Sequence, residues 1–390
     1  MAKIWERPIK ELAGLEYPCS CGRTHKVDIQ AIRVGSGCIK ELPQILKDLG
    51  ATRIFMLADN NTYEAGGRQV EELLKEAGLP YHMRLFQTQT PLVPNEYALG
   101  SALAVMESQD DMLLAVGSGT LNDLTKYISA RTGVPYVIAA TAPSMDGYAS
   151  TVSPMILDGI KTTLPAVYPA AIVADVDIMK DAPMPMLTAG FGDIIGKYTA
   201  LCDWRLSRQL FDEYYCEEAA TLVERALEKC AENAKGLAQR DPQAVEAVTE
   251  ALILSGVAMG LVGNSRPASG AEHHMAHFWE MDALRRGEEH PLHGNSVGSA
   301  AVVSASLYEL AAKELPEGFT PPDKDKIIAC LEAAGATVSP KDLGIRRDLC
   351  LEALLHAMKM RDRFTILRFM DGKGLLSACA VELTNRFYNS

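Results

Sequence analysis

Three histidines lie close together in SGAEHHMAHFWEM, residues 269–281, a stretch with a helical pattern. At about 3.6 residues per turn, His273 and His277 share a helix face one turn apart, whereas His274 is rotated by about 100°. His273 and His277 can therefore meet one ligand or metal, and His274 faces elsewhere. Glu272 precedes the pair instead of lying between its members, so the zinc-protease motif H-E-x-x-H is absent.

A divalent metal would explain these histidines. His293, in LHGNSVG, is expected on an irregular segment before a new helix, and an open metal site needs three protein ligands and a vacant position. Asp193, in AGFGDIIGKY, is the best third ligand because it lies in an apolar helix start, where an unpaired carboxylate would be costly; an N-cap role is the alternative. Lys197, on the same helix face, can pair with Asp193 or hold an anionic substrate group.

A glycine-rich turn offers a site for a diphosphate. LLAVGSGTLNDLTKY, residues 113–127, runs from an apolar strand through Gly117, Ser118 and Gly119 into a helix. The helix N-terminus would present free N–H groups and partial positive charge to an anion. The motif is not the six-residue dinucleotide fingerprint, and a tight strand-to-helix turn is the alternative.

Polar side chains follow two other predicted strands. Asp59 ends RIFMLAD, where an acidic residue takes the ribose hydroxyls of NAD and disfavours a 2′-phosphate, although a helix N-cap is an equal alternative. Residues 139–154, AATAPSMDGYASTVSP, follow the strand PYVIA as a polar loop at the edge where parallel sheets build sites, or as a merely solvated loop. The polar residues of this loop are Thr141, Ser144, Asp146 and Ser150.

The elements that must position these residues divide into two kinds. Between residues 28 and 175, six short apolar runs alternate with helical patterns, which predicts βαβ units and a mainly parallel sheet. After residue 182 only helical patterns follow, and the prolines of KDAPMPM mark a boundary. We expect an α/β dinucleotide-binding domain, residues 1–181, and an all-α metal- and substrate-binding domain, residues 182–390, with a cleft between them.

Composition narrows the class of protein. With 390 residues, 48% apolar and 23% charged, and no continuous apolar run of membrane-spanning length, the chain is expected to be soluble. A net charge of −12 without a basic block argues against nucleic acid as a partner. The nine scattered cysteines and the absence of an N-terminal secretory pattern favour the cytoplasm.

The segment CSCGRTH contains Cys19, Cys21 and His25, a combination that resembles part of a metal site. It lacks a second ligand pair at zinc-site spacing. We therefore expect a strand, a turn and a second strand here.

Several motifs in order resemble one family. GSGTLND, TAPSMDGYAS, GFGDIIGKY and SRPASGAEHHMAH followed by HGNSVG are similar to the sn-glycerol-1-phosphate dehydrogenases, within the iron-containing alcohol dehydrogenase and dehydroquinate synthase-like superfamily. The resemblance covers roughly residues 30–300, and the bacterial arabinose-operon branch, with its Cys-x-Cys-Gly segment, is the most similar. The sequence departs from the family's pattern at two places. A Gly-Ser-Gly turn stands in place of three glycines, which a negative φ at Ser118 would permit. The loop around His290 is also longer, with GEEHPL inserted.

This resemblance implies a nicotinamide coenzyme, NAD(H) or NADP(H), with the pyrophosphate on the glycine turn and the nicotinamide against the loop; Asp59 favours NADH. It also implies one divalent metal on Asp193, His273 and His293, with nickel or zinc expected and iron a further candidate, and a homodimer or higher homo-oligomer. Together with Asp59, the expected coenzyme residues are Gly117, Ser118, Gly119, Thr120, Leu121, Thr141, Ala142, Pro143, Ser144 and Ser150.

The implied reaction is the reversible reduction of dihydroxyacetone phosphate to sn-glycerol 1-phosphate. The metal would polarise the ketone oxygen, Asp146, Asp193 and His277 would contact the substrate, and His277 would relay the proton. Lys197 and Arg266 would neutralise the phosphate. The alternatives are a glycerol or other polyol dehydrogenase, whose uncharged substrate gives these two cations nothing to bind, a dehydroquinate synthase-like cyclase, and a catalytically silent binding protein.

Overall fold

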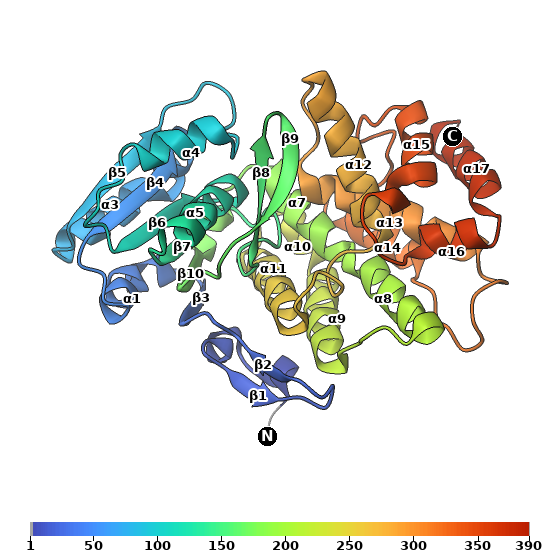
Figure 1. The fold of residues 1–390 in the computed structure, drawn as a ribbon, viewed down its shortest axis with the longest axis horizontal. Helices are drawn as coiled ribbons and strands as arrows, with labels where there is room; N and C mark the ends of the chain where they lie inside the picture. The colour runs from blue at the N-terminus through green and yellow to red at the C-terminus, as the bar shows by residue number, and fades with distance from the viewer. Residues whose placement is uncertain (1–2, 390) are drawn as a thin grey trace.

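Six parallel strands form the sheet predicted for the first part of the chain. The computed structural model describes residues 3–389, and the strands run in the order β3-β10-β7-β6-β4-β5 (Figure 1). All neighbouring pairs are parallel, and the prediction of six strands at these positions is confirmed. The strands are β3 (Ala31–Gly35), β4 (Ile54–Asp59), β5 (Tyr81–Phe86), β6 (Met112–Gly117), β7 (Tyr136–Ala140) and β10 (Ala171–Asp175).

Helices cover both faces of this sheet because its strands are apolar on both sides. In β4, Ile54 and Met56 share a core with Val70 of α3, whereas Phe55 and Leu57 share another with Leu124 of α5. This alternation follows the two-residue period of a strand. The helices and turns of this half are η1 (Ile4–Glu6), η2 (Ile9–Leu12), η3 (Cys38–Glu41), α1 (Leu42–Asp48), α2 (Asn60–Thr62), η4 (Tyr63–Gly67), α3 (Arg68–Glu76), α4 (Glu96–Leu103), α5 (Gly119–Thr132) and α6 (Val176–Met179).

Two antiparallel hairpins flank the sheet. The first, β1 (Glu16–Pro18) with β2 (Thr24–Lys26), confirms the predicted strand, turn and strand of the N-terminal segment. The second, β8 (Val152–Leu157) with β9 (Ile160–Pro165), was not predicted. Asp158 and Gly159 both have positive φ, as a tight hairpin turn requires, so this Asp-Gly pair was the signal that sequence reasoning missed.

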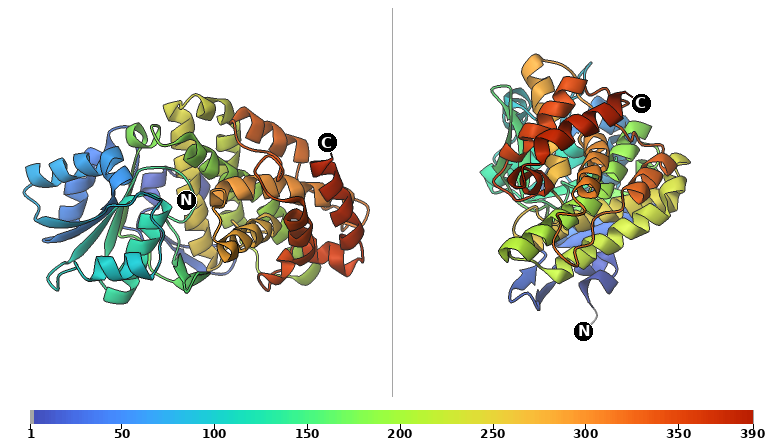
Figure 2. Two further views of the ribbon diagram at one scale, coloured as in Figure 1. Left: turned by 90° about the horizontal axis from the view of Figure 1, so that it is seen from above. Right: turned by 90° about the vertical axis from the view of Figure 1, so that its right-hand side faces the viewer.

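The second half is helical, and it lies beside the α/β half (Figures 1 and 2). The last sheet strand ends at Asp175 and α7 begins at Met184; the domain boundary after residue 181 stays a prediction. α16 and α17 lie beyond the predicted helices. The helices are α7 (Met184–Ile195), α8 (Lys197–Phe211), α9 (Glu217–Glu232), α10 (Ala234–Ala238), α11 (Pro242–Val262), α12 (Ala271–Arg286), α13 (His293–Leu310), α14 (Lys324–Ala333), α15 (Arg347–His356), η5 (Ala357–Lys359), α16 (Ile366–Gly372) and α17 (Leu376–Tyr388).

The helix break at Gly196 corrects the expectation for Asp193. Asp193 was expected in a helix start, but α7 runs from Met184 to Ile195 and α8 begins only at Lys197. Asp193 therefore lies in the last turn of α7 and not at a helix start, which excludes the N-cap role that was the alternative to metal binding.

Helices α7 and α13 approach each other closely through glycines. A Cβ atom on Gly294 would lie 1.8 Å from the carbonyl oxygen of Ala189, and one on Gly192 would lie 2.4 Å from the carbonyl oxygen of Gly294. Neither position can carry a larger side chain unless the backbone moves. This contact brings the last turn of α7, with Asp193, against the first turn of α13, with His293.

α11 is the one helix in residues 3–389 that is long and apolar enough to cross a membrane by length and composition. It has 21 residues and a mean hydropathy of 1.7, and 72% of its apolar window is buried inside the protein. Val245, Val248 and Leu252 contribute to the same core as Val223 and Leu227 of α9. Its apolar composition is thus explained by packing within this fold.

Candidate active site

One cavity of about 1420 Å³ connects the sheet to the helical half. It lies at the carboxyl ends of β4, β6 and β7 and extends to α12 and the start of α13. Ligands usually bind at this edge of an open parallel sheet. The predicted site residues that line the cavity are Asp59, Ser118, Gly119, Thr120, Leu121, Thr141, Ala142, Ser144, Asp146, Ser150, His273, His277 and His293. Those described but not among its lining residues are Gly117, Pro143, Asp193, Lys197 and Arg266.

The glycine turn has the expected form. Ser118 is the N-cap of α5 with φ of −112°, so the serine in this turn is unstrained, as predicted. Its hydroxyl lies 2.5 Å from the Ser144 hydroxyl and donates to the carbonyl oxygen of Ala142 at 3.2 Å. The first N–H groups of a helix lack intrahelical acceptors, and residues 119–121 line the cavity. The turn and the polar loop thus form one wall that can bind an anion.

Lys126 supports this wall and was not predicted. It is fully buried in α5, and its Nζ donates to Gly147 O at 2.7 Å, Ser150 Oγ at 3.0 Å and Val152 O at 3.0 Å. Nζ also pairs with Asp123 Oδ1 at 3.1 Å. The only signal in the sequence was a lysine among the buried positions of a helical pattern.

Asp59 serves as a helix N-cap at the end of β4. Its Oδ1 accepts a hydrogen bond from the backbone N–H of Thr62 at 2.8 Å. The N-cap alternative is therefore confirmed. The same side chain also lines the cavity, so a contact with a ribose remains compatible with its position.

Asp193, His273 and His293 come together from three helices. One potential ligand atom from each lies within 4.8 Å of the others, and His273 Nε2 lies 3.5 Å from Asp193 Oδ1. His293 was expected on an irregular segment, but it is the first residue of α13. A carboxylate and two imidazoles are a suitable donor set for a divalent transition metal.

Two glutamates orient the imidazoles of this group. His273 Nδ1 donates to Glu272 Oε1 at 2.8 Å, and His293 Nδ1 donates to Glu280 Oε1 at 2.7 Å. Both glutamates are fully buried. A metal-binding histidine typically has its second nitrogen held by a carboxylate in this way, so each Nε2 is available as a ligand. The residues present fit a metal.

His277, Glu280 and His293 form a second group with the same spacing. Glu280 Oε2 lies 3.4 Å from His277 Nδ1 and 2.6 Å from Lys161 Nζ, while its Oε1 accepts from His293. Glu280 thus acts as a shared hydrogen-bond acceptor. The first group, in which both Nδ1 atoms are held and both Nε2 atoms are free, fits a metal better.

Lys197 is enclosed by two carboxylates. Its Nζ lies 2.7 Å from Asp193 Oδ1 and 2.8 Å from Asp146 Oδ2, and it is fully buried. Burial alone would raise the pKa of Asp193, but Lys197 and His273 outweigh it and hold that pKa well below its usual range. Burial would lower the pKa of Lys197, yet the two carboxylates raise it. Lys197 therefore neutralises its neighbours, and the expectation that it holds a substrate phosphate is not supported.

Arg266 does not face the cavity either. Its Nε donates to Glu213 Oε1 at 2.7 Å, its Nη2 donates to the other oxygen of Glu213, and its Nη1 donates to Phe364 O at 2.7 Å. The residue is 3% exposed. Because its guanidinium already has a carboxylate and a carbonyl as partners, the predicted phosphate contact is not supported.

A different arginine occupies the cavity wall. Arg361, which follows η5, lines the cavity, and its Nη1 donates to Ser265 Oγ at 3.4 Å. Arg363 donates to Ser265 Oγ at 3.0 Å and to Ser269 O at 2.8 Å. Neither arginine has an ion pair within residues 3–389. Burial lowers the pKa of Arg361. Burial and the neighbouring arginines lower the pKa of Arg363 to about 10. Both remain cationic near neutral pH, and Arg361 places positive charge at the cavity wall.

The two remaining histidines of the helix are separated as predicted. His277 lines the cavity one turn from His273, and burial lowers its pKa to about 3 although Glu280 opposes this shift. Its ring is thus neutral near neutral pH and can accept a hydrogen bond. His274 is fully buried, does not line the cavity, and within residues 3–389 has no hydrogen-bond partner for either nitrogen.

Two solved structures share this fold. The structure of an iron-containing alcohol dehydrogenase from Thermococcus thioreducens matches with a TM-score of 0.71 and 16% sequence identity, over 93% of this chain and 99% of that one. The structure of glycerol dehydrogenase from Schizosaccharomyces pombe matches with a TM-score of 0.65 and 18% sequence identity, over 91% of this chain and 90% of that one. The sequence model of the iron-containing alcohol dehydrogenases matches residues 33–183. The chain therefore has the fold of these dehydrogenases.

Relatives in sequence define the family. Glycerol-1-phosphate dehydrogenase of Halalkalibacterium halodurans, named for NAD(P)+, is 37% identical over 92% of this chain and 96% of that protein. The enzyme of the same name from Methanosarcina acetivorans is 34% identical over 90% of this chain and 92% of that protein. The chain belongs to the glycerol-1-phosphate dehydrogenase family.

Proposed function

We propose that this protein catalyses the reversible, NAD(P)H-linked reduction of dihydroxyacetone phosphate to sn-glycerol 1-phosphate with one bound divalent metal. The observation that carries this proposal is that Asp193, His273 and His293 form one group, of which His273 and His293 line the cavity that the glycine turn of α5 also lines. A cation and a coenzyme would therefore meet in one space. The names of the relatives support the substrate.

The coenzyme would lie along the edge of the sheet. The N-terminus of α5 at Gly119–Leu121 suits the pyrophosphate, and the loop from Thr141 to Ser144, with Ser150, suits the nicotinamide half. Gly117 and Pro143 do not line the cavity but would position the neighbouring residues that make these contacts. The carboxylate of Asp59 favours NADH, because an added 2′-phosphate would approach a negative charge.

Asp193, His273 and His293 would hold the divalent cation, for which nickel, zinc and iron are the candidates. A cation at this position would supply Lewis-acid polarisation of the substrate carbonyl. Glu272 and Glu280 keep both imidazoles in the tautomer that presents Nε2. Lys197 holds Asp193 and Asp146 in one arrangement.

The substrate would lie between this site and Arg361. Asp146 and His277 line the same space, so the neutral His277 ring can bind a substrate hydroxyl and take part in the proton transfer. Arg361, which lacks an anionic partner, would bind the phosphate in place of Lys197 and Arg266. This position gives a phosphorylated substrate an advantage over an uncharged polyol.

Lys126 provides a test of the coenzyme wall. Lys126→Met removes the hydrogen bonds to Gly147, Ser150 and Val152, so we expect the KM for the coenzyme to rise about tenfold, because such charged hydrogen bonds contribute about 1.5–3 kcal/mol. Steady-state kinetics at saturating substrate would measure this. Lys75→Met, on exposed α3, is the control and should leave KM unchanged; equal values for both variants would contradict the proposal.

A substrate panel tests the proposed function itself. The metal-loaded protein should reduce dihydroxyacetone phosphate with a far higher kcat/KM than dihydroxyacetone, and more efficiently with NADH than with NADPH. Chiral analysis of the product should give sn-glycerol 1-phosphate. Equal kcat/KM values for the two ketones would favour the polyol dehydrogenase instead.

The cytoplasm is the proposed location, and the nine free cysteines of the structure support it because secreted chains more often pair them. The homodimer or higher homo-oligomer implied by the resemblance stays a prediction. Sedimentation or light scattering of the purified protein would test it.

A further inference from the structure

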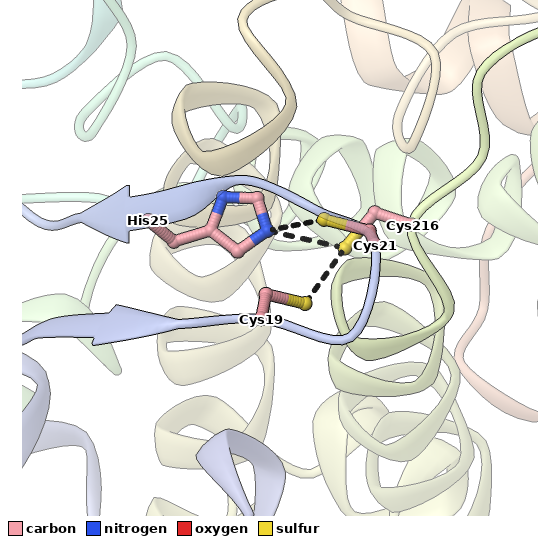
Figure 3. A group of neighbouring side chains, drawn as sticks. All are labelled: Cys19, Cys21, His25 and Cys216. Carbon is pink, nitrogen blue, oxygen red and sulfur yellow. Dashed lines mark hydrogen bonds between the residues drawn. The ribbon is translucent and has the colours of Figure 1, made fainter.

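Four side chains that could bind a metal ion lie together outside the lining of the cavity. Cys19, Cys21 and His25 come from the β1–β2 hairpin, and Cys216 is the N-cap of α9. Figure 3 shows the three sulfur atoms and the imidazole turned toward one another. Sequence reasoning found only the first three, because Cys216 lies 191 residues after His25, beyond the whole parallel sheet, α7 and α8.

The spacing of the four side chains is that of a tetrahedral metal site. Cys19 Sγ lies 3.8 Å from Cys216 Sγ, and His25 Nε2 lies 3.3 Å from both Cys21 Sγ and Cys216 Sγ. Zinc with bonds of about 2.3 Å to sulfur and about 2.0 Å to nitrogen places two sulfurs about 3.8 Å apart and sulfur and nitrogen about 3.5 Å apart. All four ligand atoms lie within 4.8 Å of one another.

The surroundings orient the donor atoms. The Tyr214 hydroxyl donates to Cys21 Sγ at 3.2 Å, and the backbone N–H of Ala219 lies 3.5 Å from Cys216 Sγ. The Nε2 atom of His25 lies toward the sulfurs. Hydrogen-bond donors to thiolate sulfur are a usual second layer of such a site.

We propose that Cys19, Cys21, His25 and Cys216 bind a structural zinc ion. Three thiolates and one imidazole fill the four positions of tetrahedral zinc, so the site is closed to substrate. Binding would release the thiol protons to solvent. A disulfide is the competing fate of these cysteines, but it requires two sulfurs about 2.05 Å apart and leaves the other thiol and the imidazole without a role.

This zinc would join the N-terminal hairpin to the start of α9. A separate contact joins the same hairpin to α11, because Arg23 donates to Val262 O at 2.9 Å at the end of that helix. The loop after α11 carries Ser265 and Ser269, which line the cavity. The ion would therefore stabilise the hairpin that contacts the helix before this loop, without taking part in the reaction.

Metal analysis of reduced, purified full-length protein tests the proposal, and it does so independently of the proposed function. Mass spectrometry of metals should find two metal ions per wild-type chain loaded with zinc and the active-site metal. Cys216→Ser should bind one fewer zinc and lower Tm by at least about 5 °C, because structural zinc contributes folding free energy. Cys230→Ser, in the same helix but outside the cluster, should keep both metals, since a serine hydroxyl can also donate to Ala247 O.

Cobalt substitution of the wild-type protein tests the site without any variant. The three thiolates should produce cobalt–thiolate charge-transfer absorption, which the active site lacks because its donors are Asp193, His273 and His293. His273→Ala should lose the active-site metal and keep this absorption. A zinc content that Cys216→Ser does not reduce, or cobalt-loaded wild-type protein without thiolate absorption, would overturn the proposal.

Discussion

His273→Ala is expected to remove the active-site metal and to lower kcat/KM by at least about 10³-fold, because Lewis-acid stabilisation of the transition state is worth several kcal/mol. His273 sits between Asp193, 3.5 Å from its Nε2, and Glu272, 2.8 Å from its Nδ1. Alanine removes the ligand atom and leaves both carboxylates without this partner. Metal analysis and initial rates with dihydroxyacetone phosphate would measure the two effects.

The adjacent histidine is the matched control. His274 is fully buried, and neither of its nitrogens has a hydrogen-bond partner in the described chain. His274→Leu replaces it with an apolar side chain of similar size, so metal content and kcat/KM should stay near those of the wild type. Full activity with stoichiometric metal in His273→Ala would contradict the assignment of the site.

The elements of the fold could be predicted where local pattern decides them. The strands from Ile54 and Met112 are buried on both faces, and an apolar run bounded by turns indicates this directly. The break between α7 and α8 could not be predicted, because Gly196 alone does not end a helix. Its Cβ position lies 2.5 Å from the Val297 side chain, so the contact with α13 explains the glycine.

Of the candidate site, only the relations between residues on the same helix could be predicted from their spacing in the sequence. The separation of His273 from His274 follows from helix geometry alone. The partner that orients His293 is Glu280 of another helix, and Lys126 is recognisable only after the loop that it holds is placed beside it. Arg266 was expected to bind phosphate from its place beside the histidine motif in sequence, but tertiary structure pairs it with Glu213.

Arg361 should decide the preference for a phosphorylated substrate. We expect Arg361→Gln to lower kcat/KM for dihydroxyacetone phosphate about 10²-fold, because charge-assisted hydrogen bonds to phosphate contribute about 1.5–3 kcal/mol. Arg361 lines the cavity and has no carboxylate partner in the described part of the chain, so the variant leaves no buried acid unpaired there. The lost free energy should therefore appear in substrate binding and not in folding.

Dihydroxyacetone separates loss of phosphate binding from general damage to the site. Its kcat/KM should be nearly the same for the wild type and Arg361→Gln, since it has no phosphate to lose. Arg386→Gln, on the exposed face of α17, is the control for removing one surface arginine and should change neither substrate. Equal losses of kcat/KM for both ketones would show that Arg361 has a structural role. An unchanged kcat/KM for both ketones would show that the phosphate binds in another part of the cavity.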